Sequence, residues 1–108
     1  MKSIPEPDWK VLRELAPALR DRYCERAMTE IARAASEGEG SAHERYLTLY
    51  ELVRKSDKRL GRAFDDLRRS NALLKLALMH AYGLLTPEEF RRFGAETRSV
   101  VQGVVDSK

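Results

Sequence analysis

The sequence has few residues of the kinds that build most catalytic and metal sites. It contains one cysteine, Cys24, and two histidines among 108 residues. A single cysteine excludes an intrachain disulfide, and a reducing cytoplasm is the simplest compartment for such a chain. The histidines, Cys24 and the acidic residues show neither the His-Glu-x-x-His nor the Cys-x-x-Cys spacing of metal sites. We therefore expect no metal and no cofactor.

Long apolar runs and strand-like patterns are also absent. The first ten residues, MKSIPEPDWK, have no apolar core and do not predict a signal peptide. The longest apolar run, around ALMHAYGLL, is far shorter than the about 20 residues that a membrane-spanning helix needs. No segment alternates cleanly between apolar and polar side chains, which disfavours strands. These absences predict a soluble cytoplasmic protein with no membrane partner.

Charge and helix-forming residues are abundant instead. Charged residues make up 34% of the chain and hydrophobic residues 43%, with a formal net charge of +3. The mixture of Ala, Leu, Glu, Lys and Arg favours helices. The length fits a single domain over residues 1–108. We predict an all-α fold, a compact bundle of five or six helices, with the long helices antiparallel because the loops between them are short.

Capping signals and prolines divide the first part of the chain. Asp8 is expected to cap a first helix. Pro17 then either begins a second helix or kinks one long helix, because proline is accepted in a first turn but costs about 3 kcal/mol inside a helix. In either case the helical pattern reaches about Ala35. Residues 36–40, SEGEG, indicate a loop.

A second long helix is predicted to begin at Ser41, which has the capping-box spacing with Glu44. Its apolar stripe is Tyr46, Leu49, Tyr50, Val53, Leu60, Phe64 and Leu67. Gly61 and the Ser56-Asp57 pair are the positions at which this helix is expected to kink or to divide in two, if it does either. Asp57 falls inside the apolar stripe, so we prefer a helix break that Asp57 caps over a buried Asp–Arg pair.

A third helical segment, about 70–82, is apolar around most of its circumference and is expected to be the central helix of the bundle. Its candidate caps are Asp65, Asp66 and Ser70. Gly83 is expected to end it. Residues 86–89, TPEE, combine a cap, a first-turn proline and a second capping box, and predict a short helix near 87–93. A last helix is expected after Gly94.

Residues 54–71, RKSDKRLGRAFDDLRRSN, hold seven basic and three acidic side chains. The candidate anion or nucleic-acid face is Arg54, Lys58, Arg59 and Arg62. Acidic residues share this face, and two pairs have the favourable four-residue spacing: Glu51 with Lys55, and Arg62 with Asp66. No aromatic side chain is interleaved with the basic ones, as a single-strand stacking surface would need. We therefore prefer a solvated helix face over a nucleic-acid face.

Three further residues are candidates for function. His80 lies on an apolar helix face, where a histidine that is substantially buried and hydrogen-bonded to a neighbouring helix or loop is expected in preference to a ligand. Cys24 could act as a nucleophile only if the fold brought a histidine near it. Trp9 is a candidate protein interface, since aromatic residues often anchor interfaces.

Four segments also carry a resemblance to known proteins: SIPEPDWK, SAHERY, AFDDLRRSNALL and GLLTPEEFRRF. Together they resemble a group of small bacterial proteins of about this length that are usually labelled hypothetical or uncharacterised. The resemblance spans nearly the whole chain. It implies a stand-alone bacterial cytoplasmic helical protein, and it implies no activity, ligand or catalytic residue.

These patterns favour a non-enzymatic helical module that binds another protein or a second copy of itself. A small chain with many helices and no catalytic motif gains stability by covering apolar helix faces between subunits. The alternative is nucleic-acid binding through the basic face of the helix 42–67. A further alternative, which we do not favour, is an enzyme with a site near His80 or Cys24.

Overall fold

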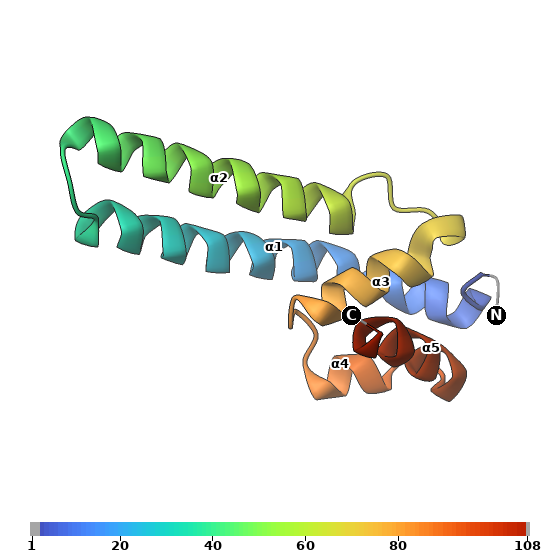
Figure 1. Ribbon diagram of the computed structural model, residues 1–108. Helices are drawn as coiled ribbons and strands as arrows, with labels where there is room; N and C mark the ends of the chain where they lie inside the picture. The colour runs from blue at the N-terminus through green and yellow to red at the C-terminus, as the bar shows by residue number, and fades with distance from the viewer. Residues whose placement is uncertain (1–2, 108) are drawn as a thin grey trace.

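The computed structural model describes residues 3–107, and within this range the chain forms five α-helices and one 3-10 turn, with no strand (Figure 1). The elements are α1 (Glu6–Glu37), α2 (Ala42–Phe64), η1 (Arg69–Asn71), α3 (Ala72–Ala81), α4 (Pro87–Arg91) and α5 (Ala95–Asp106). The predicted all-α fold is confirmed. The two long helices, α1 and α2, form an antiparallel hairpin, as expected from the short loop between them (Figure 1).

Helix α1 passes through Pro17 without ending, so the helix is one long element. Exposed Pro17 is tolerated because Leu15 and Leu19 beside it are buried, and their packing offsets the cost of the lost backbone hydrogen bond. The prediction that Asp8 caps this helix is wrong. Pro5 holds the extended conformation before the helix, at φ −60° and ψ 150°, so the helix begins two residues before Asp8.

The loop between the long helices is shorter than predicted, because α1 continues to Glu37 and α2 begins after Ser41. The capping box is confirmed. The backbone N–H of Glu44 donates to Ser41 Oγ at 3.1 Å, and the backbone N–H of Ser41 donates to Glu44 Oε1 at 3.3 Å. Two otherwise unpaired helix donors are therefore satisfied at the tip of the hairpin.

Helix α2 also runs unbroken through the residues expected to weaken it. Both predictions for Asp57 are wrong, since this residue is neither a cap nor buried but lies exposed in the middle of the helix. The apolar stripe that contains Asp57 is open to water at this level. A carboxylate therefore keeps its hydration there and needs neither a helix break nor a buried partner.

Residues 65–68 form an irregular turn that leads into η1, and none of the three predicted caps starts α3. Asn71 holds the turn: its Nδ2 donates to the carbonyl oxygen of Asp66 at 2.8 Å, and its Oδ1 accepts from the N–H of Arg68 at 2.9 Å. The predicted end at Gly83 is confirmed. Gly83 has a positive φ of 70°. Its N–H donates to the carbonyl oxygen of His80, and the N–H of Leu84 donates to the carbonyl oxygen of Met79.

Helix α3 is the central helix, as predicted, because it packs against α1, α2 and α5. Its buried side chains join those of the N-terminal half of α1 and of the C-terminal segments in one core. The largest fully buried side chains are Ile4, Leu12, Leu19, Leu76, Met79, Leu84, Phe93, Val101 and Thr97. Every one of them lies outside the stretch from residue 24 to residue 62.

The hairpin projects well beyond this core (Figure 1). The molecule measures 52 × 24 × 22 Å, and α3, α4 and α5 pack around one end of the two long helices. From Cys24 to Arg62 no residue is buried. The free end of the hairpin is therefore a pair of helices with no third layer over it.

Candidate functional site

One side of the free hairpin carries a continuous apolar surface, which we name the hairpin apolar face: Met28, Ile31, Tyr46, Tyr50 and Val53. Ile31 is half-buried, and the other four are exposed, at 61% for Met28, 66% for Tyr46, 59% for Tyr50 and 46% for Val53. Met28, Ile31 and Val53 line a shallow groove between α1 and α2. Tyr46 and Tyr50 extend it toward the tip, because residues three and four apart share one side of a helix.

The sequence of α2 explains why this surface is left open. Leu49, Leu52 and Ser56 are half-buried and lie on the side of α2 that packs against α1. Tyr50 and Val53, each one position further along, lie about 100° around the helix. The apolar arc of α2 is thus wider than one neighbouring helix can cover, and such an arc requires a second layer.

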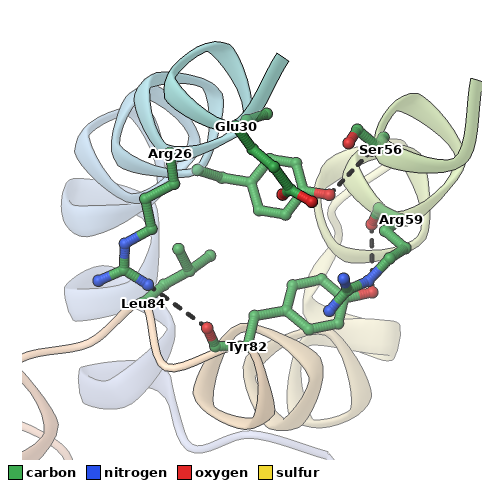
Figure 2. A pocket seen from close by; sticks show the side chains of 8 residues that line it. Arg26, Glu30, Ser56, Arg59, Tyr82 and Leu84 are labelled. Atoms are coloured by element: carbon green, nitrogen blue, oxygen red, sulfur yellow. Dashed lines mark hydrogen bonds between the residues drawn. The ribbon is translucent and has the colours of Figure 1, made fainter. Parts of the chain in front are cut away.

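The part of the other side of the hairpin that faces α3 is polar (Figure 2), whereas nearer the tip Leu47 and Leu52 line a shallow groove on α2. Met28 on α1 and Asp57 on α2 line the groove. Arg26 and Arg59 are each two positions away from one of them along the same helix, and therefore point about 200° away from the groove. Arg26 Nη1 donates to the carbonyl oxygen of Gly83 at 3.0 Å, and the guanidinium of Arg59 lies 4.5 Å from the ring centroid of Tyr82. Helix α3 therefore occupies the side opposite the hairpin apolar face.

A small cleft lies at this polar junction, lined by Tyr23, Arg26, Ala27, Glu30, Ser56, Arg59, Tyr82 and Leu84 (Figure 2). The hydroxyl of Tyr23 donates to the carbonyl oxygen of Ser56 at 2.9 Å, and that of Tyr82 donates to the carbonyl oxygen of Arg59 at 3.2 Å. Burial raises the pKa of Tyr23 above its usual value. The polar groups of the cleft join the three helices to one another, which is a structural role.

The four residues of the predicted basic face, Arg54, Lys58, Arg59 and Arg62, have different surroundings in the structure. Arg54 forms an ion pair with Glu51 at 2.9 Å, and their hydrogen bond lowers the pKa of Glu51. Arg59 is stacked on Tyr82. The side chains of Lys58 and Arg62 are exposed. Whether this face binds an anion stays a prediction.

Neither predicted pair reaches ion-pair distance within residues 3–107, although the charge of Lys55 adds to the effect of Arg54 in lowering the pKa of Glu51. Glu51 pairs with Arg54, three residues away, and Asp66 pairs with Arg68. Helix α2 ends at Phe64, and Asp66 lies beyond it with a positive φ of 56°. Asp66 is therefore no longer in helical register with Arg62, and the four-residue rule does not apply to that pair.

His80 forms the hydrogen bond that its helix face predicts. Its Nε2 lies 3.0 Å from Oε1 of Gln102 on α5, and its ring stacks on Phe90 with centroids 4.1 Å apart and planes 6° from parallel. The side chain is half-buried, less than a central histidine was expected to be. Gln102 is itself exposed, which places this pair at the edge of the core.

Cys24 and Trp9 lie in different surroundings. Cys24 is half-buried and lines the groove of the hairpin apolar face together with Ser56 and Asp57. Neither histidine is among the residues that line this groove. Trp9 is half-buried against the core, with the guanidinium carbon of Arg13 5.5 Å from the centroid of its ring. A protein interface at Trp9 stays a prediction.

Sequence reasoning missed two polar contacts that fix the C-terminal helices. Asp8 is 5% exposed, and its carboxylate accepts hydrogen bonds from Gly94 N, at 2.9 Å, and from Thr97 Oγ1. Arg22 forms an ion pair with Glu89 at 2.8 Å, and this contact lowers the pKa of Glu89 to about 2. Both join residues more than 60 positions apart, and a single sequence carries no signal for such pairs.

Within residues 3–107, no helix combines the length and the apolar character needed to cross a membrane. Comparison of the chain with models of protein families, with curated proteins and with solved structures gives no match.

Proposed function

We propose that the protein is a non-enzymatic interaction module that binds a protein partner, either another protein or a second copy of itself, through the hairpin apolar face. The observation that carries this proposal is the stretch from Cys24 to Arg62, which contains no buried residue although α2 is strongly amphipathic. The single cysteine supports a cytoplasmic place of action.

The size and composition of the surface support binding. Tyr46, Tyr50, Met28 and Val53 together expose on the order of 400–500 Å² of side chain, which is as large as the largest apolar patch on most monomers. Tyrosine is among the residues that most often dominate binding energy. Isolated surface leucines are common, but two tyrosines, a methionine and a valine on one side of a projecting hairpin form a contiguous patch.

The shape of the surface indicates the kind of partner. The groove between two antiparallel helices accepts the ridge of a third helix, whose apolar residues repeat three and four positions apart. Such a helix would supply the missing layer over α1 and α2. The expected partner surface is therefore helical and apolar, with charged residues at its edges.

Site-specific photo-cross-linking in living cells tests the proposal. A benzophenone amino acid in place of Tyr50 places the reactive group on the hairpin apolar face, and the same amino acid in place of exposed Thr48 on α2 is the matched control. Thr48 lies about 200° around the helix from Tyr50. We expect discrete protein adducts from position 50 and none from position 48.

The substitution Val53→Glu places a charge on the same surface and should remove the adducts formed from position 50. Equal cross-linking from positions 48 and 50, or adducts that persist with Val53→Glu, would contradict binding through this face.

A further inference from the structure

We infer that the occupant of the hairpin apolar face is a second copy of this chain, and that two hairpins pair face to face into a four-helix bundle with their tips at the same end. This inference rests on the proposed function, because it names the partner of the same surface. It is carried by the charge distribution of the hairpin, by the area of the face and by the position of α3–α5.

The acidic and basic residues of the free hairpin nearly balance, so two copies of it do not strongly repel each other. The segment from Cys24 to Leu60 contains seven acidic and seven basic residues, and Arg62, the last residue of the stretch without buried residues, adds one positive charge, whereas the whole chain has a net charge of +3. The acidic residues are Glu25, Glu30, Glu37, Glu39, Glu44, Glu51 and Asp57, and the basic residues are Arg26, Arg33, Arg45, Arg54, Lys55, Lys58 and Arg59. Two copies of this segment therefore approach each other without net repulsion.

The charges are also divided between the two helices of the hairpin. The α1 side, with the loop, has four of the acidic residues and two of the basic ones, whereas the α2 side has three acidic and five basic residues. A twofold axis parallel to the helices places α1 of one copy beside α2 of the other, so helices of opposite net charge become neighbours. The opposite signs remain when Arg26, Glu30 and Arg59, which line the cleft on the α3 side, are left out of the count. An axis across the helices would instead place like against like.

The contacts in this arrangement follow from the position of each residue along the common direction of α1 and α2. The bond from Tyr23 to Ser56 and the shared groove of Met28 and Val53 place these residues at matching levels on α1 and α2. When α1 lies over α2 of the second copy, Met28 packs on Tyr50 and Val53 of that copy. Methionine adapts its shape to aromatic neighbours, which suits this contact.

The rest of the molecule leaves room for this pairing. Arg26 and Arg59 hold the end of α3 on the side of the hairpin away from the hairpin apolar face (Figure 2). In the proposed dimer the C-terminal helices of the two copies therefore lie on the two outer sides of the bundle. Within residues 3–107, only residues of α1 and α2 line the groove of the hairpin apolar face, so α3, α4 and α5 do not cover it.

The area predicts how strong the dimer is. Two faces of this size bury roughly 1,000 Å² in total, which is at the lower limit for a specific interface. An interface of this size gives a reversible dimer, with a dissociation constant on the order of micromolar. The bundle is thus expected to assemble and dissociate within the concentration range of ordinary solution measurements.

Disulfide trapping between two different single-cysteine variants tests both the partner and the arrangement. Both carry Cys24→Ser; one adds Met28→Cys and the other adds Val53→Cys. A disulfide needs Cα atoms within about 7 Å, which the proposed contact of position 28 with position 53 of the other copy allows. Residue 28 of one copy and residue 28 of the other would lie on helices that face each other across the diagonal of the bundle. The axes of adjacent helices are already about 8–10 Å apart and those of diagonal helices are further apart, so these two residues are beyond the reach of a disulfide.

We expect covalent heterodimers when the two variants are mixed and oxidised, and at least tenfold less cross-linking when each is oxidised alone. Efficient cross-linking of the Met28→Cys variant alone would place α1 against α1 and overturn the arrangement. The absence of cross-links in all three samples would overturn the second copy as the partner, provided circular dichroism shows that both variants retain their helical content.

Sedimentation velocity over a hundredfold concentration range separates this inference from the proposed function. The wild type and the control Thr48→Glu should shift from monomer to dimer, while Val53→Glu stays monomeric. A wild type that stays monomeric throughout, together with adducts to another protein from position 50, refutes the dimer and leaves the proposed function standing. A monomeric wild type with no adducts from position 50 refutes both.

Discussion

The hydroxyl of Tyr23 donates a hydrogen bond of 2.9 Å to the main-chain carbonyl oxygen of Ser56, and this bond stands at the boundary between the buried and the open part of the hairpin. Tyr23 is the last buried residue of α1. Beyond it, no residue of the hairpin is buried as far as Arg62, although the end of α3 still contacts Arg26 and Arg59 on one side. On one side of this boundary the chain covers its own apolar side chains and forms a core. On the other side the apolar side chains of the hairpin stay exposed, and a partner can cover them.

The ion pair between Arg22 and Glu89 makes stability depend on pH. The folded-state pKa of Glu89 is lowered to about 2, mainly by the hydrogen bond from Arg22. A lowered carboxyl pKa stabilises the fold fully above the unfolded pKa of about 4.3, and this stabilisation is lost as the pH falls from there to about 2. The side chains are 32% and 18% exposed, so solvent screening reduces the contribution to about 1–2 kcal/mol.

Glu89→Gln removes the charge and keeps a residue that can complete the capping box with Thr86. Urea unfolding should show a loss of about 1–2 kcal/mol at pH 7 and a smaller loss at pH 3. The neighbouring Glu88→Gln is the matched control, because Glu88 is 81% exposed and 3.7 Å from Arg91. An equal loss at both pH values would show that the charge of Glu89 does not stabilise the fold.

The buried carboxylate of Asp8 should be essential for docking α5. Asp8→Ala removes the buried charged acceptor of the bonds from Gly94 and Thr97. We expect a loss of about 2–3 kcal/mol in the free energy of unfolding. Asp21→Ala, at an exposed position of the same helix, should change it by less than about 0.5 kcal/mol. Similar losses for both variants would refute the structural role of Asp8.

His80→Leu should be tolerated. The substitution removes the bond to Gln102, but Gln102 is exposed and can bond to water, and leucine keeps an apolar contact with Phe90. The change in thermal stability should correspond to less than about 1 kcal/mol. A loss of more than about 2 kcal/mol would indicate that His80 is part of a buried polar network rather than an edge contact.

The basic face of α2 should not bind nucleic acid. Arg54 is paired with Glu51, and Arg59 is stacked on Tyr82, so two of its four cations are already engaged. Titration of labelled DNA and RNA of mixed sequence at low salt should show no saturable binding by this face. Binding that weakens steeply with salt and is lost in Lys58→Glu would contradict this expectation and establish the basic face as an interface.

The sequence predicts the elements that depend on neighbouring residues. The capping box of Ser41, the glycine that ends α3 and the antiparallel order of the long helices are all set within a few positions of the chain. Such signals need no knowledge of distant residues. This locality explains why the start of α2 and the end of α3 were predicted correctly, whereas the helix predicted over 42–67 ends at Phe64.

The elements that depend on distant residues were not predictable. Asp8 resembles a helix cap locally, and only its contact with Gly94 and Thr97 reveals its role. The apolar stripe of α2 predicts a buried face, but a stripe does not say how far the covering helices extend. Because α3 and α5 have 10 and 12 residues against 32 in α1, they cover one end of the hairpin only. The hairpin apolar face follows from this difference in length.

Amide hydrogen exchange as a function of protein concentration tests most directly whether the free hairpin is completed by a partner. In dilute solution, amides of residues 28–37 and 42–53 should exchange through local opening, much faster than those of α3. Raising the concentration above the micromolar range should slow exchange in these two segments by at least tenfold and leave α3 unchanged. Exchange in both segments that is as slow as in α3 at the lowest concentration, and that does not change with concentration, would contradict the account.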